Sequence, residues 1–170
     1  MESLPSNDLL PSHELLLEDS DATAALGARL AGCLPARAVV HLHGDLGAGK
    51  STLARAMLRA LGVTGTIRSP TYTLVEQYPL LGTGLPGRGA EVGGTALHLD
   101  LYRIGDPGEL EFLGLDGDTR LWLVEWPERG LGGLPPADLD IALAVEGYGR
   151  RCVLRAGSAI GAAWLADLSA

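Results

Sequence analysis

The segment of the sequence with the clearest chemistry is residues 44–51, GDLGAGKS. It fits the phosphate-binding loop pattern G-x-x-x-x-G-K-[ST]. Lys50 is the single lysine among 13 basic residues, and the other twelve are arginines. A compact ammonium on a flexible stem can reach under a triphosphate, whereas a planar guanidinium would need a wider pocket. The segment therefore predicts a site for a nucleoside triphosphate.

A glycine loop of this kind binds phosphate through its backbone. Its N–H groups form an anion-binding nest, and the helix expected to begin near Lys50 directs its positive end at the phosphates. Lys50 would reach the β and γ phosphates, and Ser51 would give its hydroxyl to Mg²⁺. The predicted nucleotide-binding residues of this segment are Gly44, Asp45, Leu46, Gly47, Ala48, Gly49, Lys50, Ser51 and Thr52.

Two acidic residues end predicted strands and are the candidate metal ligands. Asp100 follows the apolar stretch 96–99, and Glu125 follows 121–124. In enzymes with this loop, such an acid holds the metal through water and can orient the attacking water. We therefore predict that at least one of the two acids serves the metal shell, while each taken singly is either a metal ligand or the polar residue that ends a buried strand. The catalytic candidates are Lys50, Asp100 and Glu125, and the metal-ligand candidates are Ser51, Asp100 and Glu125.

Several neighbouring residues leave alternatives open. His98 shares a strand face with Asp100 and is either a sensor of the site or a structural histidine. Arg103 and Arg129 follow the two acidic strand ends, and each is either an arginine finger or a surface ion-pair partner. Trp126 directly follows Glu125. A tryptophan at such a position more often packs in the core than serves as a platform for a nucleobase.

The rest of the composition narrows the ligand and the partner. The guanine-specificity motif [NT]-K-x-D is absent, which favours ATP by elimination. A net charge of −8 and a pI near 4.9 disfavour direct tight binding to DNA or RNA and favour a protein partner. The N-terminus lacks a signal-peptide pattern, and no apolar run reaches the about 18 residues of a membrane span. We expect a cytoplasmic protein without a membrane partner.

The pattern of elements predicts an α/β fold. A loose lead-in over residues 1–17 ends in an edge strand at 14–17, and Ser20 caps a helix that runs to about residue 34. A glycine-rich, mobile connection is expected over 79–96. Further strands are predicted at 38–43, after the turn 69–75, and at 95–102, 121–125, 139–145 and 152–154, with helices at 50–61, 107–115 and 159–168. This alternation predicts one domain over residues 1–170, with a mostly parallel central sheet flanked by helices.

Four segments in this order resemble the TsaE (formerly YjeE) family: residues 44–52, 69–75, 98–103 and 124–128. Residues 106–114 resemble the family's next stretch, and the resemblance extends over about residues 20–136. It implies a P-loop NTPase-like fold and a cytoplasmic ATPase that binds ATP and Mg²⁺ and hydrolyses ATP slowly. It also implies a partner, the TsaD–TsaB complex, which transfers threonylcarbamoyl to a tRNA adenosine. The chain would act on that complex, would meet tRNA through it, and would not itself be the transferase.

The resemblance carries roles to matching positions. Lys50 and Ser51 take the phosphate and metal roles, Asp100 the Walker-B-like role, and Glu125 the magnesium or water role. Thr23 matches a threonine near the nucleotide, and the switch or partner-facing candidates are Ser69, Thr71, Tyr72, Arg103 and Trp126. Ser51 replaces the family's usual threonine, residues 79–96 are longer than the family's connection, the segment between Gly114 and Glu125 is shorter, and the match is thin after Pro136. A small-molecule P-loop kinase and a nucleotide-gated binding module are the competing interpretations.

Overall fold

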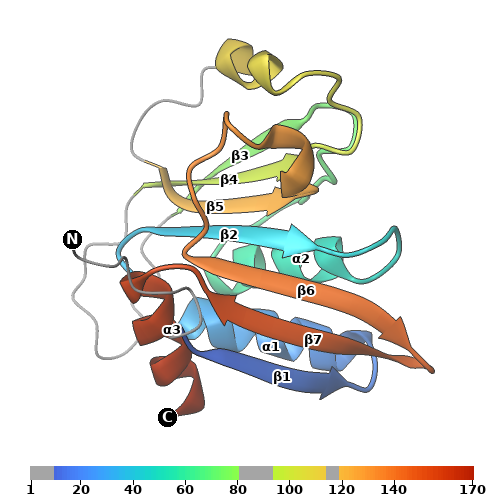
Figure 1. Cartoon of the computed structure of the whole chain (residues 1–170), viewed down its shortest axis with the longest axis vertical. Coiled ribbons are helices and arrows are strands. Elements are labelled where there is room, and N and C mark those ends of the chain that lie inside the picture. The colour runs from blue at the N-terminus through green and yellow to red at the C-terminus, as the bar shows by residue number, and fades with distance from the viewer. Residues whose placement is uncertain (1–9, 81–93, 114–118) are drawn as a thin grey trace, which may run out of the picture.

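A seven-stranded sheet organises the computed structural model, which describes residues 10–80, 94–113 and 119–170 (Figure 1). The strand order is β1-β7-β6-β2-β5-β4-β3. The strands are β1 (Ser12–Leu17), β2 (Ala38–His43), β3 (Val75–Pro79), β4 (Thr95–Asp100), β5 (Thr119–Glu125), β6 (Leu139–Glu146) and β7 (Gly149–Ala156). The helices are α1 (Ser20–Gly32), α2 (Lys50–Ala60) and α3 (Ala159–Ser169), and the 3₁₀ helices are η2 (Pro107–Leu113) and η3 (Pro127–Gly130).

The centre of the sheet is parallel and its margins are antiparallel. Strand β2 pairs in parallel with β5 and β6, and β5 pairs in parallel with β4. Strand β3 at one edge, and β7 and β1 at the other, run antiparallel to their neighbours. The carboxyl ends of β2, β4 and β5 therefore meet along one rim of the sheet, where ligands bind in open parallel sheets.

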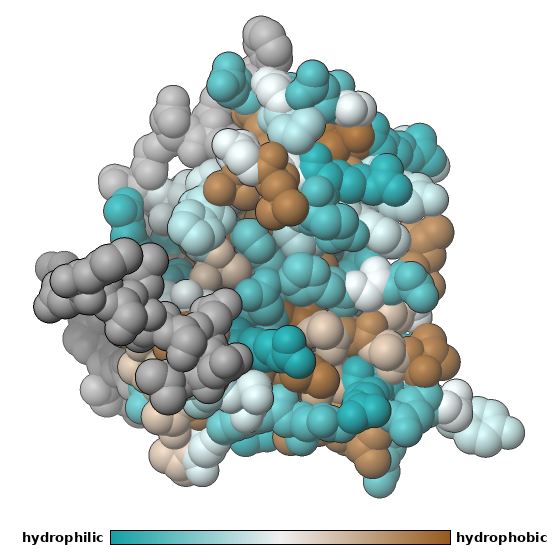
Figure 2. Space-filling view, in the orientation of Figure 1, coloured by the Kyte–Doolittle hydropathy of each residue, from teal (hydrophilic) through white to brown (hydrophobic). Residues whose placement is uncertain are grey.

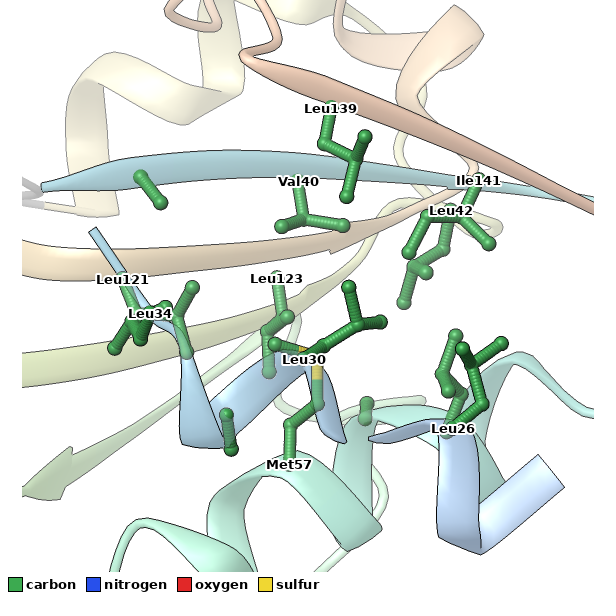
Figure 3. Packing of buried hydrophobic residues seen from close by; sticks show 14 of the residues in the cluster. Leu26, Leu30, Leu34, Val40, Leu42, Met57, Leu121, Leu123, Leu139 and Ile141 are labelled. Carbon is green, nitrogen blue, oxygen red and sulfur yellow. The ribbon is translucent and has the colours of Figure 1, made fainter. Parts of the chain in front are cut away.

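Helices α1 and α2 cover one face of the sheet and enclose the main core. Leu26 and Leu30 of α1 and Met57 of α2 point at the strand side chains in Figure 3. The strand side chains opposite them are Val40, Leu42, Leu121, Leu123, Leu139 and Ile141. These side chains are almost fully buried, and each contributes about 2 kcal/mol by leaving water. Helix α3 joins this core through Trp164, whose indole N–H donates to Leu30 O at 3.1 Å.

The two long helices approach closely at Gly27. A Cβ there would lie 2.8 Å from Ala56 Cβ and 2.9 Å from Leu53 O. Only a residue without a side chain fits between α1 and the backbone of α2 at this point. Gly27 thus sets the position of α1 against the helix that follows the glycine loop.

A smaller core lies on the other face, under η2 and η3. Side chains alternate across a strand, so Leu97 and Leu99 of β4 and Val124 of β5 point to this face. They pack with Leu101 and Leu110. By the same alternation His98, Asp100 and Glu125 point to the face that carries α1 and α2.

The predicted α/β fold with a parallel sheet centre is confirmed, and the element boundaries need corrections. The cap of α1 is Asp19 rather than Ser20: the backbone of Asp19 is extended, and its carboxylate accepts from Ala22 N at 2.8 Å. Strand β4 ends at Asp100, two residues early, because the Asp100 carboxylate accepts from Tyr102 N and turns the chain.

Other observed boundaries differ from the predicted ones by a few residues. The edge strand begins at Ser12, so the lead-in is ordered there, while residues 1–9 lie outside the described residues. The ends of the predicted connection 79–96 belong to β3 and β4, and residues 81–93 are outside the description. The helix predicted at 107–115 is a 3₁₀ helix over Pro107–Leu113, and residues 114 and 115 lie outside the described residues. The 3₁₀ helix η3 was not predicted, and β7 is longer than the predicted strand 152–154.

Figure 2 shows hydrophilic residues over most of the face seen in Figure 1, with hydrophobic residues in small patches. Within the part of the chain that the structure describes, no helix is long and apolar enough to cross a membrane.

Candidate functional site

The glycine loop connects β2 to α2 at the rim of the sheet. Gly44, Gly47 and Gly49 have φ of 142°, 78° and 107°, which is backbone that side chains rarely tolerate. A Cβ on Gly44 would lie 2.4 Å from Leu143 O, so the loop also lies hard against β6. The residue types of the motif are thus required by the course of the backbone.

Lys50, the first residue of α2, turns its side chain back into the loop. It is 5% exposed, and its ammonium donates to Gly44 O and, at 3.5 Å, to Asp45 O. The same ammonium lies 3.8 Å from the centre of the Trp126 ring. Burial lowers the pKa of Lys50, and the Glu125 and Asp100 carboxylates oppose that shift. The ammonium is held by weak acceptors that a phosphate oxygen could replace.

Trp126 adopts a backbone conformation that is rare for a large side chain. Its φ is 57° and its ψ is 50°, at the point where β5 gives way to η3. The ring packs against Tyr102, with centroids 4.9 Å apart, as well as against the Lys50 ammonium. Strain of this kind costs of order 1–3 kcal/mol and persists where the surroundings fix it. Trp126 therefore belongs to the site and not to packing alone.

The two predicted acids lie side by side. Asp100 and Glu125 are register neighbours on β4 and β5, and they are 7% and 3% exposed. The Ser51 hydroxyl is within hydrogen-bond distance of both Glu125 oxygens, at 3.0 and 3.2 Å. The residues predicted from separate segments as metal ligands therefore come together.

His98 is a neighbour of this group through Glu125. Its Nε2 lies 2.6 Å from Glu125 Oε2, and the ring is 1% exposed. His98 Nδ1 has no hydrogen-bond partner among the described residues. His98 does not line the pocket, so it can act on the site only through the carboxylate it contacts.

The segment before β3 reaches the other acid. Thr71 Oγ1 donates to Asp100 Oδ2 at 3.2 Å, and Ser69 Oγ lies 2.8 Å from the same threonine hydroxyl. Tyr72 instead points outward, 81% exposed, and stacks against the Arg103 guanidinium at 4.6 Å. Of these switch candidates, Thr71 touches the site, Ser69 supports it, and the other two lie outside.

A cavity of about 310 Å³ joins these groups. Of the predicted residues, Thr23, Leu46, Gly47, Ala48, Gly49, Lys50, Ser51, Thr52, Thr71, Asp100, Glu125 and Trp126 line it. Gly44 and Asp45 do not line it but accept hydrogen bonds from Lys50. Arg129, a finger candidate, donates to Tyr102 O at 2.7 Å.

The cavity also has walls that the sequence did not predict. Asp19 and Ser20, at the start of α1, line it, as do Tyr148, Gly149 and Arg150 from the β6–β7 hairpin. Tyr148 lies in the hairpin turn, Gly149 and Arg150 begin β7, and none of the three matches a motif. Their position depends on β6 running parallel beside β2, which brings the carboxyl ends of both strands to one rim and which no local pattern reveals.

The sequence matches the family model "Threonylcarbamoyl adenosine biosynthesis protein TsaE" over residues 17–153. Two similar curated proteins are both called tRNA threonylcarbamoyladenosine biosynthesis protein TsaE. The one from Haemophilus influenzae is 46% identical over 104 residues, 59% of this chain and 59% of its own length. The match thus spans less than two thirds of that relative. The one from Aquifex aeolicus is 34% identical over 142 residues, 82% of this chain and 92% of its own length.

A solved structure shares the fold. Bacillus subtilis YdiB superposes with a TM-score of 0.72 at 23% identity, and the match covers 95% of this chain and 96% of that one.

Proposed function

Since this chain belongs to the TsaE family, we propose that it is the accessory ATPase of threonylcarbamoyladenosine formation on tRNA. It binds ATP with Mg²⁺, hydrolyses it slowly to ADP and phosphate, and acts in the cytoplasm on the TsaD–TsaB complex. That complex carries out the transfer and holds the tRNA. The observation that supports the proposal best is the meeting of Lys50, Ser51, Asp100 and Glu125 in one cavity.

The donors in the cavity suit magnesium. Ser51 offers a hydroxyl, and Asp100 and Glu125 offer carboxylates, so the groups are all hard oxygen ligands. Magnesium binds through one or two carboxylates together with substrate phosphates, which matches this set. When bound, the ion would neutralise charge that develops on the phosphates.

The protein's own groups would divide the work. The loop N–H groups and Lys50 hold the β and γ phosphates, and exchange of the Lys50 ammonium from Gly44 O to phosphate makes a stronger hydrogen bond. The Glu125 carboxylate orients the attacking water beside Ser51. The contact between Thr71 and Asp100 links the segment before β3 to the metal shell. Loss of the γ phosphate would therefore change the conformation of the surface near Tyr72.

The size of the cavity favours an ATPase over a small-molecule kinase. Its volume of about 310 Å³ is at the lower end of the roughly 300–1,000 Å³ of ligand pockets. A kinase must hold an acceptor beside the nucleotide, which requires a larger site than ATP hydrolysis does. The missing guanine motif favours ATP over GTP by elimination.

The test is phosphate release from ATP with Mg²⁺, measured for the chain alone and with TsaD and TsaB of the same organism. Slow release alone, a changed rate with the pair, and tRNA modification that requires all three proteins would support the proposal. A rate of phosphate release that TsaD and TsaB leave unchanged would contradict it. Phosphate transferred to a small acceptor would favour the kinase instead, and binding without turnover under every condition would favour a nucleotide-gated binding module.

A further inference from the structure

Arg150 reaches the glycine loop from the far end of the chain. It lies near the start of β7, where side chains alternate between the two faces of the sheet, and it points to the face that carries α1 and α2. Its Nε donates to Ala48 O at 3.0 Å and its Nη2 to Gly47 O at 3.1 Å. Its Nη1 donates to Gly149 O at 2.9 Å.

These contacts act on a part of the loop where two glycines flank Ala48. Gly47 and Gly49 have left-handed backbone, and glycine has the most conformational freedom to lose on ordering. In a planar peptide group the C=O and the following N–H point in opposite directions. A guanidinium that holds the Ala48 carbonyl toward itself therefore turns the Gly49 N–H to the opposite side.

We infer that Arg150 is a positioning residue of the nucleotide site: it holds the loop carbonyls of Gly47 and Ala48 so that the loop is ordered before phosphate arrives. The inference rests on the proposed function for its consequence in binding, but the contact itself does not. All three guanidinium nitrogens are engaged with backbone carbonyls. These contacts use three of the five N–H donors of Arg150, and through the two to Gly47 and Ala48 it acts on the loop.

The geometry separates this role from that of charge alone. Two carbonyls are met by two nitrogens of one planar group, which a lysine cannot reproduce. Arg150→Lys keeps the positive charge near the phosphate site but loses the paired contact with the Gly47 and Ala48 carbonyls. Arg150→Met keeps much of the aliphatic stem but loses both the charge and the paired contact. Order supplied in advance lowers the entropy cost of binding, so its loss should appear in affinity more than in turnover.

The adjacent residue provides a matched control. Arg151 points to the opposite face of the sheet and pairs with Glu14 of β1 at 2.5 Å. It does not line the cavity. Arg151→Met therefore removes the same charge one residue away without touching the loop.

The experiment measures the Kd of a non-hydrolysable ATP analogue with Mg²⁺ by calorimetry, the rate at saturating ATP, and amide hydrogen exchange of residues 45–49 without nucleotide. For Arg150→Met and Arg150→Lys we expect about tenfold weaker binding, as for the loss of charge-assisted hydrogen bonds. We also expect faster exchange in the loop and a smaller fold-change in the saturated rate than in affinity. Arg151→Met should match the parent protein in all three. Circular dichroism confirms that each variant is folded.

Unchanged affinity and exchange in Arg150→Met would overturn the inference. Wild-type affinity in Arg150→Lys would overturn it as well, because charge alone would then account for the effect. If the parent chain binds no nucleotide, the proposed function fails, while the exchange rates still decide whether Arg150 orders the loop.

Discussion

Replacing Glu125 by alanine should abolish ATP turnover and also destabilise the fold. The substitution removes the acceptor of the His98 Nε2 contact at 2.6 Å, and His98 is 1% exposed. A buried polar group left without a partner costs about 1–3 kcal/mol. Ser51 loses the same acceptor, but its hydroxyl lies beside the cavity and can turn to water. We therefore expect the free energy of unfolding to fall by about 2 kcal/mol, chiefly through His98.

Glu125→Gln separates the two effects. The amide has the shape of the carboxylate and can both donate and accept, so His98 and Ser51 each keep a partner. Its unfolding free energy should stay within about 1 kcal/mol of the parent protein, while hydrolysis is lost as in Glu125→Ala. Both variants should still bind the nucleotide, since Lys50 and the loop are intact.

The assays are urea denaturation for stability, calorimetry for binding and phosphate release for turnover. Equal stability of Glu125→Ala and the parent protein would refute the reasoning about His98. Normal hydrolysis by Glu125→Gln would refute the assignment of Glu125.

Three further predictions follow from other parts of the structure. Lys50→Ala should lose measurable nucleotide binding in calorimetry, and binding within twofold of the parent protein would remove the lysine from the phosphate site. Gly27→Ala should lower the unfolding free energy by about 1–3 kcal/mol through overpacking. Gly32→Ala should not, because a Cβ there would have nothing within 4 Å. Equal melting temperatures of Gly27→Ala and the parent protein would contradict the close helix contact. Burial raises the pKa of the Cys152 thiol from 9.0 to about 12, so the unfolded state loses this proton first and stability should fall as pH rises above about 9. In a Cys33→Ala background, Cys152→Val should lessen the fall of the unfolding free energy with pH above about 9. If Cys152→Val leaves that fall unchanged, other groups cause it.

What could be predicted from the sequence was local. The glycine loop and the strand ends at Asp100 and Glu125 show in short windows because residue type at fixed spacing determines their backbone and face. Alternation along β4 placed His98 on the same face as Asp100. It could not show that His98 meets Glu125, since that contact depends on the register between β4 and β5.

What the sequence missed was long-range or a competition between neighbours. Arg150 contacts Ala48 across 102 positions, and it is the parallel pairing of β6 with β2 that brings the hairpin to the cavity. At the start of α1, Asp19 and Ser20 are both good caps, and the carboxylate one position earlier takes the role. The Trp126 conformation has no signal in its residue type, because large side chains rarely adopt it.

The strand order also constrains how the chain is synthesised. Strand β2 leaves the ribosome early, yet its neighbours in the sheet, β5 and β6, follow some 80 to 100 residues later. Strand β1 waits still longer, since Ser12 pairs with Arg155. Contacts this distant in sequence slow folding and leave apolar strands unpaired in the nascent chain. The glycine loop therefore cannot acquire its final walls, which include Tyr148 and Arg150, until nearly the whole protein has been translated.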